Sequence, residues 1–257
     1  MKTYGIIPSR FGSTRFPGKP LAMLSGKPLV VWVVEAVKRA QSLDEVLVAT
    51  DDERIVRAVT EAGGKAVMTP SALPSGTDRI ACAARVHAAE AGLADFADDD
   101  ILVNIQGDEP LIDPALIDSL VMRLRIQSSW DMATAVAPLA TADDLSAKSV
   151  VKVVLGRDDA ALYFSRAPIP CRRDGDPDLT AGDYVRHIGI YAYRGGFLKR
   201  YIETPPCALE RIEKLEQLRA LWMGAKIAVV RTAGEGLGVD TPEDAERVAK
   251  ILAARAR

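Results

Sequence analysis

YGIIPSRFGSTRFPGKPL, residues 4–21, joins a short apolar run to a loop that contains glycine, proline and basic residues. The run at 4–7 is too short for a helix, so it predicts a buried strand, and the loop then leaves the carboxyl end of that strand. In open α/β sheets, ligands bind at that edge. The loop carries three arginine or lysine residues and no acidic residue. The sequence therefore places local positive charge where an α/β fold binds its ligand.

Apolar runs and helical stretches alternate through the next part of the chain. The expected elements are strands at 3–8, 45–50, 65–69, 100–106 and 132–139, and helices at 28–41, 52–62, 77–91 and from Pro114. This alternation is typical of βαβ units, so we expect a mostly parallel sheet.

The order changes after about residue 150. The expected elements are strands at 151–155, 161–165, 187–193 and 226–230, and helices at 195–204, 209–223 and 242–255. Residues 165–184 are rich in Pro, Gly, Asp and Arg and are too long for an ordinary hairpin loop. We interpret this segment as a functional or dimer-forming excursion from a single domain of residues 1–257.

Composition narrows the class of protein. A chain of 257 residues with 48% hydrophobic content can bury a substantial core. The 33 basic and 35 acidic residues nearly balance, so neither a nucleic acid nor a membrane surface is expected as a partner. Cys82, Cys171 and Cys207 lie far apart, which argues against a disulfide framework or zinc site and suits a reducing compartment. Without a signal-peptide pattern or a long apolar run, the chain is expected in the cytoplasm.

The basic loop matches neither of two standard phosphate motifs. Backbone N–H groups, Arg15 and Lys19 could together hold a polyphosphate. However, Gly12 and Gly18 enclose five residues and Lys19 precedes a proline, which excludes a Walker A loop. GEGLG at 234–238 has the wrong spacing for a dinucleotide fingerprint. An ordinary solvated basic loop stays open as the alternative.

Three further segments hold candidate site residues with structural alternatives. SGTDR at 75–79 begins a helix, so its hydroxyls and free N–H groups could bind a ligand or only cap the helix. Asp108 directly follows a buried strand, where a carboxylate suits Mg²⁺ but is also common as an Asx-turn residue. In GVDTPED at 238–244, Thr241, Pro242 and Asp244 complete a helix start, which leaves Asp240 spare.

Two segments after residue 150 carry polar side chains on defined faces. Alternation in HIGIYAY places His187, Gly189 and Tyr191 on one face, with a gap at the glycine that suits a hydroxylated ligand; a structural histidine is the alternative. In the expected helix 209–223, Gln217 shares a face with two glutamates. The apolar stripe of that helix is expected to be Leu209, Ile212, Leu215, Leu218 and Trp222.

Seven segments together resemble the 3-deoxy-manno-octulosonate (Kdo) cytidylyltransferase family. The resemblance covers residues 4–248, and the segments, in the family's order, are PSRFGSTRFPGKPL, SGTDR, NIQGDEP, ALYFSRAPIP, RHIGIYAYR, IEKLEQLR and GVDTPED. Any one of them is a weak signal, but the set is specific. The family more often has alanine where Ser9 and Gly12 stand here, and these exchanges of one small residue for another do not affect the assignment.

The resemblance implies a three-layer α/β nucleotide-diphospho-sugar transferase fold, which is Rossmann-like, with a mostly parallel central sheet. It implies transfer of a cytidylyl group from CTP to the 2-hydroxyl of Kdo, with release of pyrophosphate, for lipopolysaccharide synthesis. It further implies Mg²⁺ as cofactor and a homodimer.

The resemblance also assigns roles to individual residues. Those matched to CTP binding are Pro8, Ser9, Arg10, Ser13, Arg15, Lys19, Ser75, Gly76 and Gln106. The catalytic set is Lys19, Asp108 and Asp240, and the two aspartates would hold the metal. Those matched to substrate binding are Arg79, Arg166, His187, Tyr191 and Gln217, with Arg166 on the sugar carboxylate.

Three alternatives stay open at this point. The acceptor could be another 2-keto sugar acid, either an 8-amino-Kdo or a sialic-acid-like sugar. A nucleotide-sugar binding module without catalysis is disfavoured by the presence of both Asp108 and Asp240. An NAD-dependent dehydrogenase is disfavoured because the glycine fingerprint fails.

Overall fold

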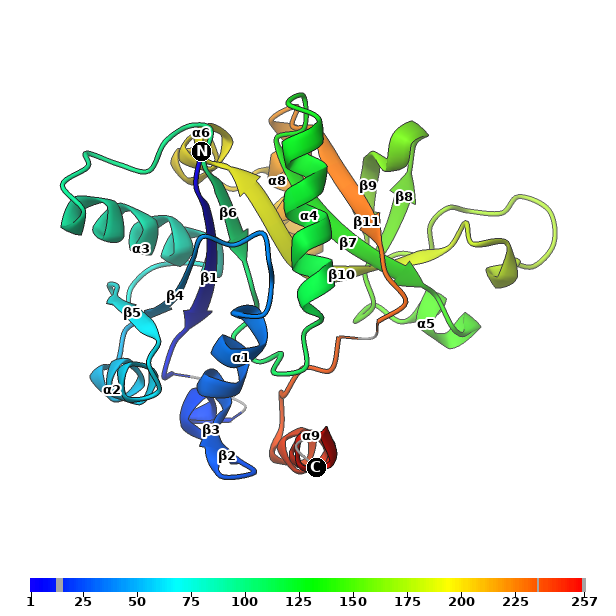
Figure 1. The fold of residues 1–257 in the computed structure, drawn as a ribbon. Coiled ribbons are helices and arrows are strands. Elements are labelled where there is room, and N and C mark those ends of the chain that lie inside the picture. Colours follow the sequence, from blue (N-terminus) through cyan, green and yellow to red (C-terminus); the bar gives the residue numbers. More distant parts are fainter. Residues whose placement is uncertain (13–15, 235, 256–257) are drawn as a thin grey trace. The chain divides into compact units, whose positions relative to one another are not determined.

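The computed structural model describes residues 1–12, 16–234 and 236–255 (Figure 1). Contacts group the chain into two compact units. Unit 1 comprises residues 1–118 and 236–257, and unit 2 comprises residues 119–235. Helix α4 (Pro114–Ile126) contains the boundary. The expectation of one domain over 1–257 stays a prediction.

Unit 1 contains four parallel strands in the order β6-β1-β4-β5. Their bounds are β1 Thr3–Ser9, β4 Glu45–Thr50, β5 Lys65–Met68 and β6 Ile101–Asn104. In register, Ile6 of β1 lies between Leu47 of β4 and Asn104 of β6. β1 and β6 are almost wholly buried, whereas the edge strand β5 exposes Lys65 and Met68. The parallel pairing of the four strands confirms the expectation from the sequence.

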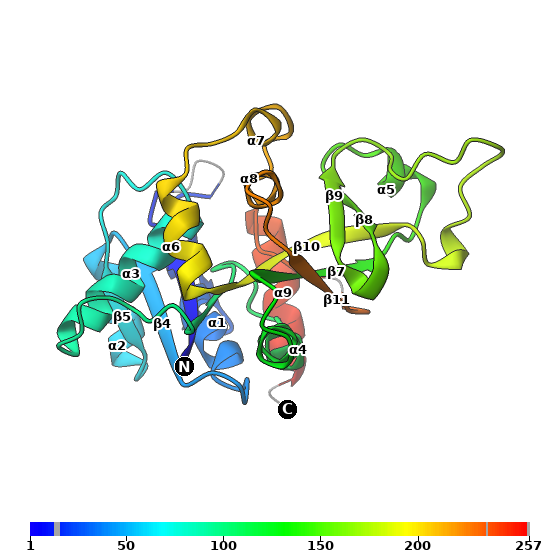
Figure 2. The same cartoon turned by 90° about the horizontal axis from the view of Figure 1, so that it is seen from above.

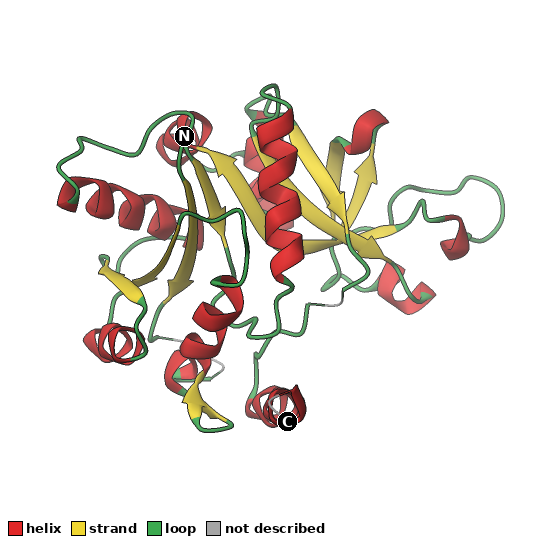
Figure 3. Cartoon of the chain, viewed as in Figure 1, coloured by secondary structure: helices red, strands yellow, loops and turns green. Residues whose placement is uncertain are grey.

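The helices of unit 1 alternate along the chain with these strands, as the sequence pattern predicts. Figure 3 distinguishes the helices (red) from the strands (yellow). Their bounds are α1 Leu29–Val37, α2 Glu53–Glu61, α3 Gly76–Glu90 and α9 Pro242–Arg255, with a 3-10 turn η1 Lys19–Leu21 and a small hairpin of β2 Met23–Leu24 and β3 Lys27–Pro28.

Helices cover both faces of the unit 1 sheet. A Cβ at Gly5 would lie 3.3 Å from Cγ1 of Val37 in α1, whereas a Cβ at Gly76 in α3 would lie 3.5 Å from Cγ of Pro8. Gly5 and Pro8 are three residues apart in β1, so their substituents point to opposite faces. Helices α1 and α3 therefore lie on opposite sides of the sheet, and unit 1 has three layers.

Unit 2 contains five strands, of which β11 pairs parallel with β7 and the others pair antiparallel. Their bounds are β7 Met132–Pro138, β8 Lys152–Leu155, β9 Ala161–Ser165, β10 Val185–Arg194 and β11 Ile227–Arg231. Its helices are α5 Ala142–Ser146, α6 Gly195–Glu203, α7 Ala208–Glu213 and α8 Gln217–Trp222, with 3-10 turns η2 Arg157–Asp159 and η3 Leu179–Ala181. The expected α/β class with a mostly parallel sheet is confirmed.

The segment between β9 and β10 projects as a long loop, as the sequence indicates (Figure 2). Residues 171–178 within it are exposed throughout.

The expected helix 209–223 was wrong in two respects. The chain forms α7 and α8 instead, and Lys214 between them adopts a left-handed conformation with φ 54°. This break changes which side chains face inward: Gln217 is 4% exposed, whereas Ile212 is 77% and Trp222 63% exposed. Of the apolar stripe predicted from helical spacing, Leu215 and Leu218 are buried, whereas Leu209, Ile212 and Trp222 are exposed.

Among the described residues, no helix is both long and apolar enough to cross a membrane.

Candidate active site

The carboxyl ends of β1 and β6 meet the start of α3 in unit 1. A Cβ at Gly107, just after β6, would lie 2.7 Å from the carbonyl oxygen of Pro8, so only glycine allows this approach of the two backbones. Gly76 packs against the ring of Pro8 from the other side. The structure thus brings together three segments that hold residues predicted to bind CTP: the end of β1, the start of α3, and the segment of Gln106 and Gly107 after β6.

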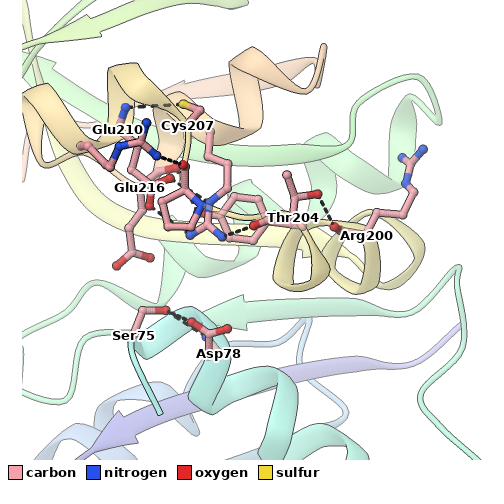
Figure 4. Close-up of polar contacts among 11 residues, drawn as sticks. Ser75, Asp78, Arg200, Thr204, Cys207, Glu210 and Glu216 are labelled. Atoms are coloured by element: carbon pink, nitrogen blue, oxygen red, sulfur yellow. Dashed lines mark hydrogen bonds and ion pairs between the residues drawn. The ribbon is translucent and has the colours of Figure 1, made fainter. Parts of the chain in front are cut away.

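Ser75 caps helix α3. Its Oγ accepts from the backbone N of Asp78 at 3.1 Å and donates to Oδ2 of Asp78 at 2.5 Å (Figure 4). The capping alternative is confirmed for this residue. A contact between Ser75 and the nucleotide stays a prediction.

Two buried polar atoms at this edge have no hydrogen-bond partner within the described part of the chain. They are Oγ of Ser9 in β1 and Oδ1 of Asn104 in β6, and both residues are only 3% exposed. Buried polar atoms are normally paired, so these two favour a bound polar ligand. The sequence analysis did not single out Asn104. The available signal was that Asn104 is a polar residue at the end of an otherwise apolar strand.

The basic loop is held at its base through Phe11. The backbone N of Phe11 donates to Oδ1 of Asp51 at 3.1 Å, and the guanidinium of Arg54 stacks 3.7 Å from the centre of the Phe11 ring. Gly18 has φ 70° and lies against the same ring, where a side chain would be strained. Arg10 is exposed. Ser13 and Arg15 lie outside the described residues.

Lys19 joins the two aspartates that the resemblance assigned to a metal. Its Nζ lies 2.6 Å from Oδ2 of Asp108 and 3.4 Å from Oδ1 of Asp240. The backbone N of Val239 donates to the carbonyl oxygen of Asp108 at 2.8 Å, which fixes the two acidic segments beside each other. Two carboxylates and one ammonium thus converge at the end of a buried strand.

This pair of carboxylates fits a magnesium ion. Both carboxylates already contact one cation, the Lys19 ammonium. The described ranges contain no group of three or more His, Cys, Asp or Glu residues able to hold a metal. Mg²⁺ needs no such group, because it commonly binds one or two carboxylates and completes its shell with waters and substrate phosphates.

Thr241 and Asp244 cap the start of α9. Oδ2 of Asp244 accepts from the backbone N of both Asp240 and Thr241 at 3.1 Å, and Oγ1 of Thr241 accepts from the N of Asp244 at 3.2 Å. This reciprocal pair completes the helix start, as predicted. The Asp240 carboxylate faces Lys19 instead.

Glu109 lies beside the pair and has an unusual acidity. Burial, together with the negative charge of Asp108, raises the pKa of Glu109 to about 7. Shifted carboxyl pKa values of this size concentrate at functional sites. The sequence did not reveal the direction of this side chain.

Arg79 is buried within unit 1. It donates from Nη1 to Oγ1 of Thr69 at 2.6 Å, and Nη2 lies 3.6 Å from Oδ2 of Asp51. Asp51 also holds Phe11, so Arg79 supports the base of the basic loop. The predicted contact between Arg79 and substrate stays a prediction.

In unit 2, His187 and Tyr191 lie on one face of β10, as predicted. Thr134 Oγ1 donates to the carbonyl oxygen of Ile190 at 2.8 Å, so it accepts from Nε2 of His187 at 2.9 Å, which leaves Nδ1 as an acceptor. Burial lowers the pKa of His187 to about 3, so the ring is neutral near neutral pH. The expected gap at Gly189 was wrong: β10 bulges there, and the two rings pack with centroids 5.4 Å apart.

Gln217 adds a polar side chain beside Tyr191 in unit 2. Its Oε1 accepts from the hydroxyl of Tyr191 at 3.3 Å. Its buried Nε2 has no hydrogen-bond partner in the ranges that the structure describes. A donor in this state is suited to a ligand hydroxyl or carboxylate.

Arg166 is held by main-chain atoms. Its Nε donates to the carbonyl oxygen of Glu213 at 2.7 Å, Nη1 to that of Lys148 at 2.8 Å, and Nη2 to that of Lys214 at 3.4 Å. A guanidinium has five N–H groups, so two have no acceptor among the residues that the structure describes. The predicted pairing with a sugar carboxylate stays a prediction.

Comparison with known proteins decides the family. The family model described as cytidylyltransferase matches residues 4–227. The 3-deoxy-manno-octulosonate cytidylyltransferase of Bdellovibrio bacteriovorus is 48% identical over 256 residues, which is 99% of each chain. That of Geobacter sulfurreducens is 46% identical over 98% of this chain and 100% of its own. The chain belongs to the 3-deoxy-manno-octulosonate cytidylyltransferase family.

Solved structures agree with membership of the Kdo cytidylyltransferase family. The structure of a CMP:2-keto-3-deoxy-manno-octonic acid synthetase complexed with CTP matches with a TM-score of 0.88 and 39% identity, covering 99% of this chain and 100% of that one. A cytidylyltransferase from Leptospira borgpetersenii has a TM-score of 0.62 at 18% identity, covering 99% and 87%, and shows only that the fold is shared.

A cavity of about 610 Å³ in unit 2 of this Kdo cytidylyltransferase family member contains none of the predicted site residues. Pro170, Arg172 and Tyr184 of the 165–184 excursion are among its lining residues. Its polar groups are partly engaged already, since Arg231 pairs with Asp159 at 3.2 Å. The cavity therefore lies at the 165–184 excursion and is not formed by the candidate site residues His187, Tyr191 and Gln217.

Proposed function

We propose that this chain transfers the cytidylyl group of CTP to the 2-hydroxyl of Kdo, giving CMP-Kdo and pyrophosphate. The single observation that carries the proposal is the convergence of Lys19, Asp108 and Asp240 at the carboxyl edge of the unit 1 sheet, in a member of this family. Acidic and basic groups at such an edge are what nucleotidyl transfer requires, because the charge on a triphosphate must be stabilised while its α-phosphorus is attacked.

Unit 1 would hold the nucleotide. Asp108 and Asp240 would bind Mg²⁺, which when present lowers the negative charge on the phosphates and favours ionisation of the attacking hydroxyl. Lys19 and Arg10 would stabilise the charge that develops on departing pyrophosphate. Ser9 and Asn104 supply the buried, unpaired polar atoms that could bind the nucleoside.

Unit 2 would hold the sugar. Nε2 of Gln217 is a donor and Nδ1 of His187 an acceptor, which together match the alternating donor and acceptor character of sugar hydroxyls. The remaining N–H groups of Arg166 would pair with the carboxylate of Kdo. Since His187 is neutral, it orients a hydroxyl without adding charge.

The deciding experiment incubates the protein with CTP, Mg²⁺ and a panel of Kdo, 8-amino-Kdo and N-acetylneuraminic acid. Pyrophosphate release and the mass of the product are measured. Fastest release with Kdo, together with formation of CMP-Kdo, is expected. Fastest release with 8-amino-Kdo or the sialic acid would assign the alternative acceptor, and no release with any sugar would refute the proposal. Omission of Mg²⁺ should abolish release.

Three further features belong to the proposal. The chain forms a homodimer through the 165–184 excursion, which is long and largely exposed. A monomeric mass by light scattering at micromolar concentration would refute this.

The reaction takes place in the cytoplasm, in line with Cys82, Cys171 and Cys207 all being free thiols. The product supplies lipopolysaccharide synthesis, as the family resemblance implies.

A further inference from the structure

Lys152 is a fully buried lysine that sequence reasoning did not single out. It lies at the start of β8 and is 0% exposed. Its Nζ donates to three main-chain carbonyl oxygens, those of Ala147 at 2.9 Å, Val150 at 2.7 Å and Arg166 at 2.7 Å. A buried ammonium has three N–H donors, and here each one has an acceptor.

The three carbonyls belong to two segments that Lys152 ties together. Ala147 and Val150 lie between α5 and β8, and Arg166 follows β9 directly. The guanidinium of Arg166 adds a further tie to the first segment, through the carbonyl of Lys148, and reaches the corner between α7 and α8 through the carbonyls of Glu213 and Lys214. The main chain and the side chain of Arg166 are thus both fixed.

The carboxylate of Glu213 adds a negative charge to the cluster that Lys152 and Arg166 form. Its Oε1 accepts from Oγ of Ser165 at 2.7 Å, and its Oε2 accepts from the backbone N of Arg166 at 3.0 Å. Gln217 begins α8 four residues after Glu213, and its amide contacts Tyr191. The corner that carries Gln217 is therefore held against the residue that follows β9.

Packing alone does not account for a lysine at this position. Burying an ammonium costs free energy that an apolar side chain of similar size avoids, so a methionine would fill the space more cheaply. The specific contribution of the ammonium is that it holds three carbonyls in one place. Burial, together with the nearby charge of Arg166, lowers the pKa of Lys152, in line with a group that is tightly enclosed.

We propose that Lys152, acting with Glu213, is a positioning residue for the sugar acid: it holds Arg166 and the α7–α8 corner so that Arg166 and Gln217 are presented to Kdo together. This inference rests on the proposed function. Lys152 itself has no contact with the sugar in this mechanism, because its three donors are all taken by main-chain carbonyls.

The test compares steady-state kinetics of Lys152→Met and Glu213→Gln with the wild type. We expect the KM for Kdo to rise about tenfold or more in both variants, the effect of losing a charge-assisted contact. The KM for CTP should stay within about twofold, because every residue of the cluster belongs to unit 2, whereas the residues predicted to bind CTP belong to unit 1. Lys148→Met is the matched control, since only the carbonyl of that exposed lysine takes part.

The outcomes separate the two proposals. Absence of pyrophosphate release by the wild type with Kdo refutes the proposed function, and the inference with it. If the wild type is active and Lys152→Met folds with an unchanged KM for Kdo, the inference is refuted and the proposed function is not. This holds whatever the melting temperature of the variant. A parallel rise in both KM values also refutes it. If Lys152→Met fails to fold, Glu213→Gln decides by the same criteria.

Discussion

Asp240 stands immediately before a helix, where an aspartate commonly serves as a cap. The contacts assign that role to Thr241 and Asp244 and leave the Asp240 carboxylate to Lys19. Capping and the proposed metal binding can therefore be separated by substitution at neighbouring positions.

We predict that Asp240→Asn lowers turnover by about a hundredfold or more, since an amide oxygen without net charge is a weaker electrostatic stabiliser. Its melting temperature should be nearly unchanged. The control Asp244→Asn should keep most of the turnover but lose about 1 kcal/mol of stability, because it weakens the cap. Pyrophosphate release across a magnesium titration and thermal melting measure both effects. Normal turnover with a lowered melting temperature in Asp240→Asn would restore the capping role.

His187 should make stability depend on pH. Its pKa of about 3 in the folded chain lies below the ordinary value of 6.5. The unfolded chain therefore binds an extra proton as pH falls below 6.5, whereas the folded chain does not. The stability that the neutral His187 contributes is fully present above pH 6.5 and is lost as pH falls toward 3. The slope approaches about 1.4 kcal/mol per pH unit. Urea unfolding at pH 4.5 and 7.5 should show a smaller loss for His187→Gln than for the wild type; equal losses would contradict the assignment.

Single residues were predictable only where a motif marked them. Lys19, Asp108 and Asp240 lie in segments that resemble the family, and the structure brings them together. Lys152 lies in an apolar strand pattern and was hidden by it, because a sequence shows which residue is charged but not which carbonyls surround it. The pKa of Glu109 likewise depends on burial that local sequence does not encode.

At the scale of elements, the loop after β6 depends on one close approach. Gly107→Ala would place a Cβ 2.7 Å from a backbone oxygen of Pro8, which cannot move aside as a flexible side chain can. We predict a loss of about 1–3 kcal/mol in stability, the usual range for overpacking, and a raised KM for CTP because Asp108 follows directly. Gly12→Ala is the control, since nothing lies within 4 Å of its Cβ position. Equal stability of both variants in urea unfolding would contradict this account.

Most expected strands and helices lie close to their observed bounds, and the clearest failure is the expected helix 209–223. A buried parallel strand is a short continuous apolar run, and the expected strand 45–50 is β4 as observed. Helix 209–223 failed because a lysine gives no signal for a left-handed break. The buried side of α7 and α8 also contains an ion pair, with Nε of Arg219 2.9 Å from Oε2 of Glu210. These charged side chains point inward, which hydrophobic spacing does not predict.

At the scale of the whole molecule, the order of strands and helices was predictable, but the grouping into two units was not. Alternation along the chain predicts βαβ units because each unit is local. The assignment of residues 236–257 to unit 1 depends on contacts with residues more than a hundred positions away, such as that between Val239 and Asp108. No local pattern reports such contacts.

The nucleotide preference belongs to the complete enzyme. We predict that CTP supports pyrophosphate release and that ATP and GTP do not, with kcat/KM lower by about a hundredfold or more for the purines, because a site built to hydrogen-bond one base leaves its buried polar groups unpaired with another. Asn104 and Ser9 are the buried groups in question. Equal release with ATP would show that the base site is misassigned.

The position of Asp240 has a consequence for chain synthesis. Unit 2, residues 119–235, is inserted between the two parts of unit 1. A chain emerging from the ribosome therefore presents Lys19 and Asp108 early, but the second carboxylate follows only after the whole inserted unit has been translated. Folding proceeds from the N-terminal side during synthesis. A chain that stops before residue 240 contains Asp108 without the second carboxylate, so the acidic pair forms only after the whole inserted unit has been translated.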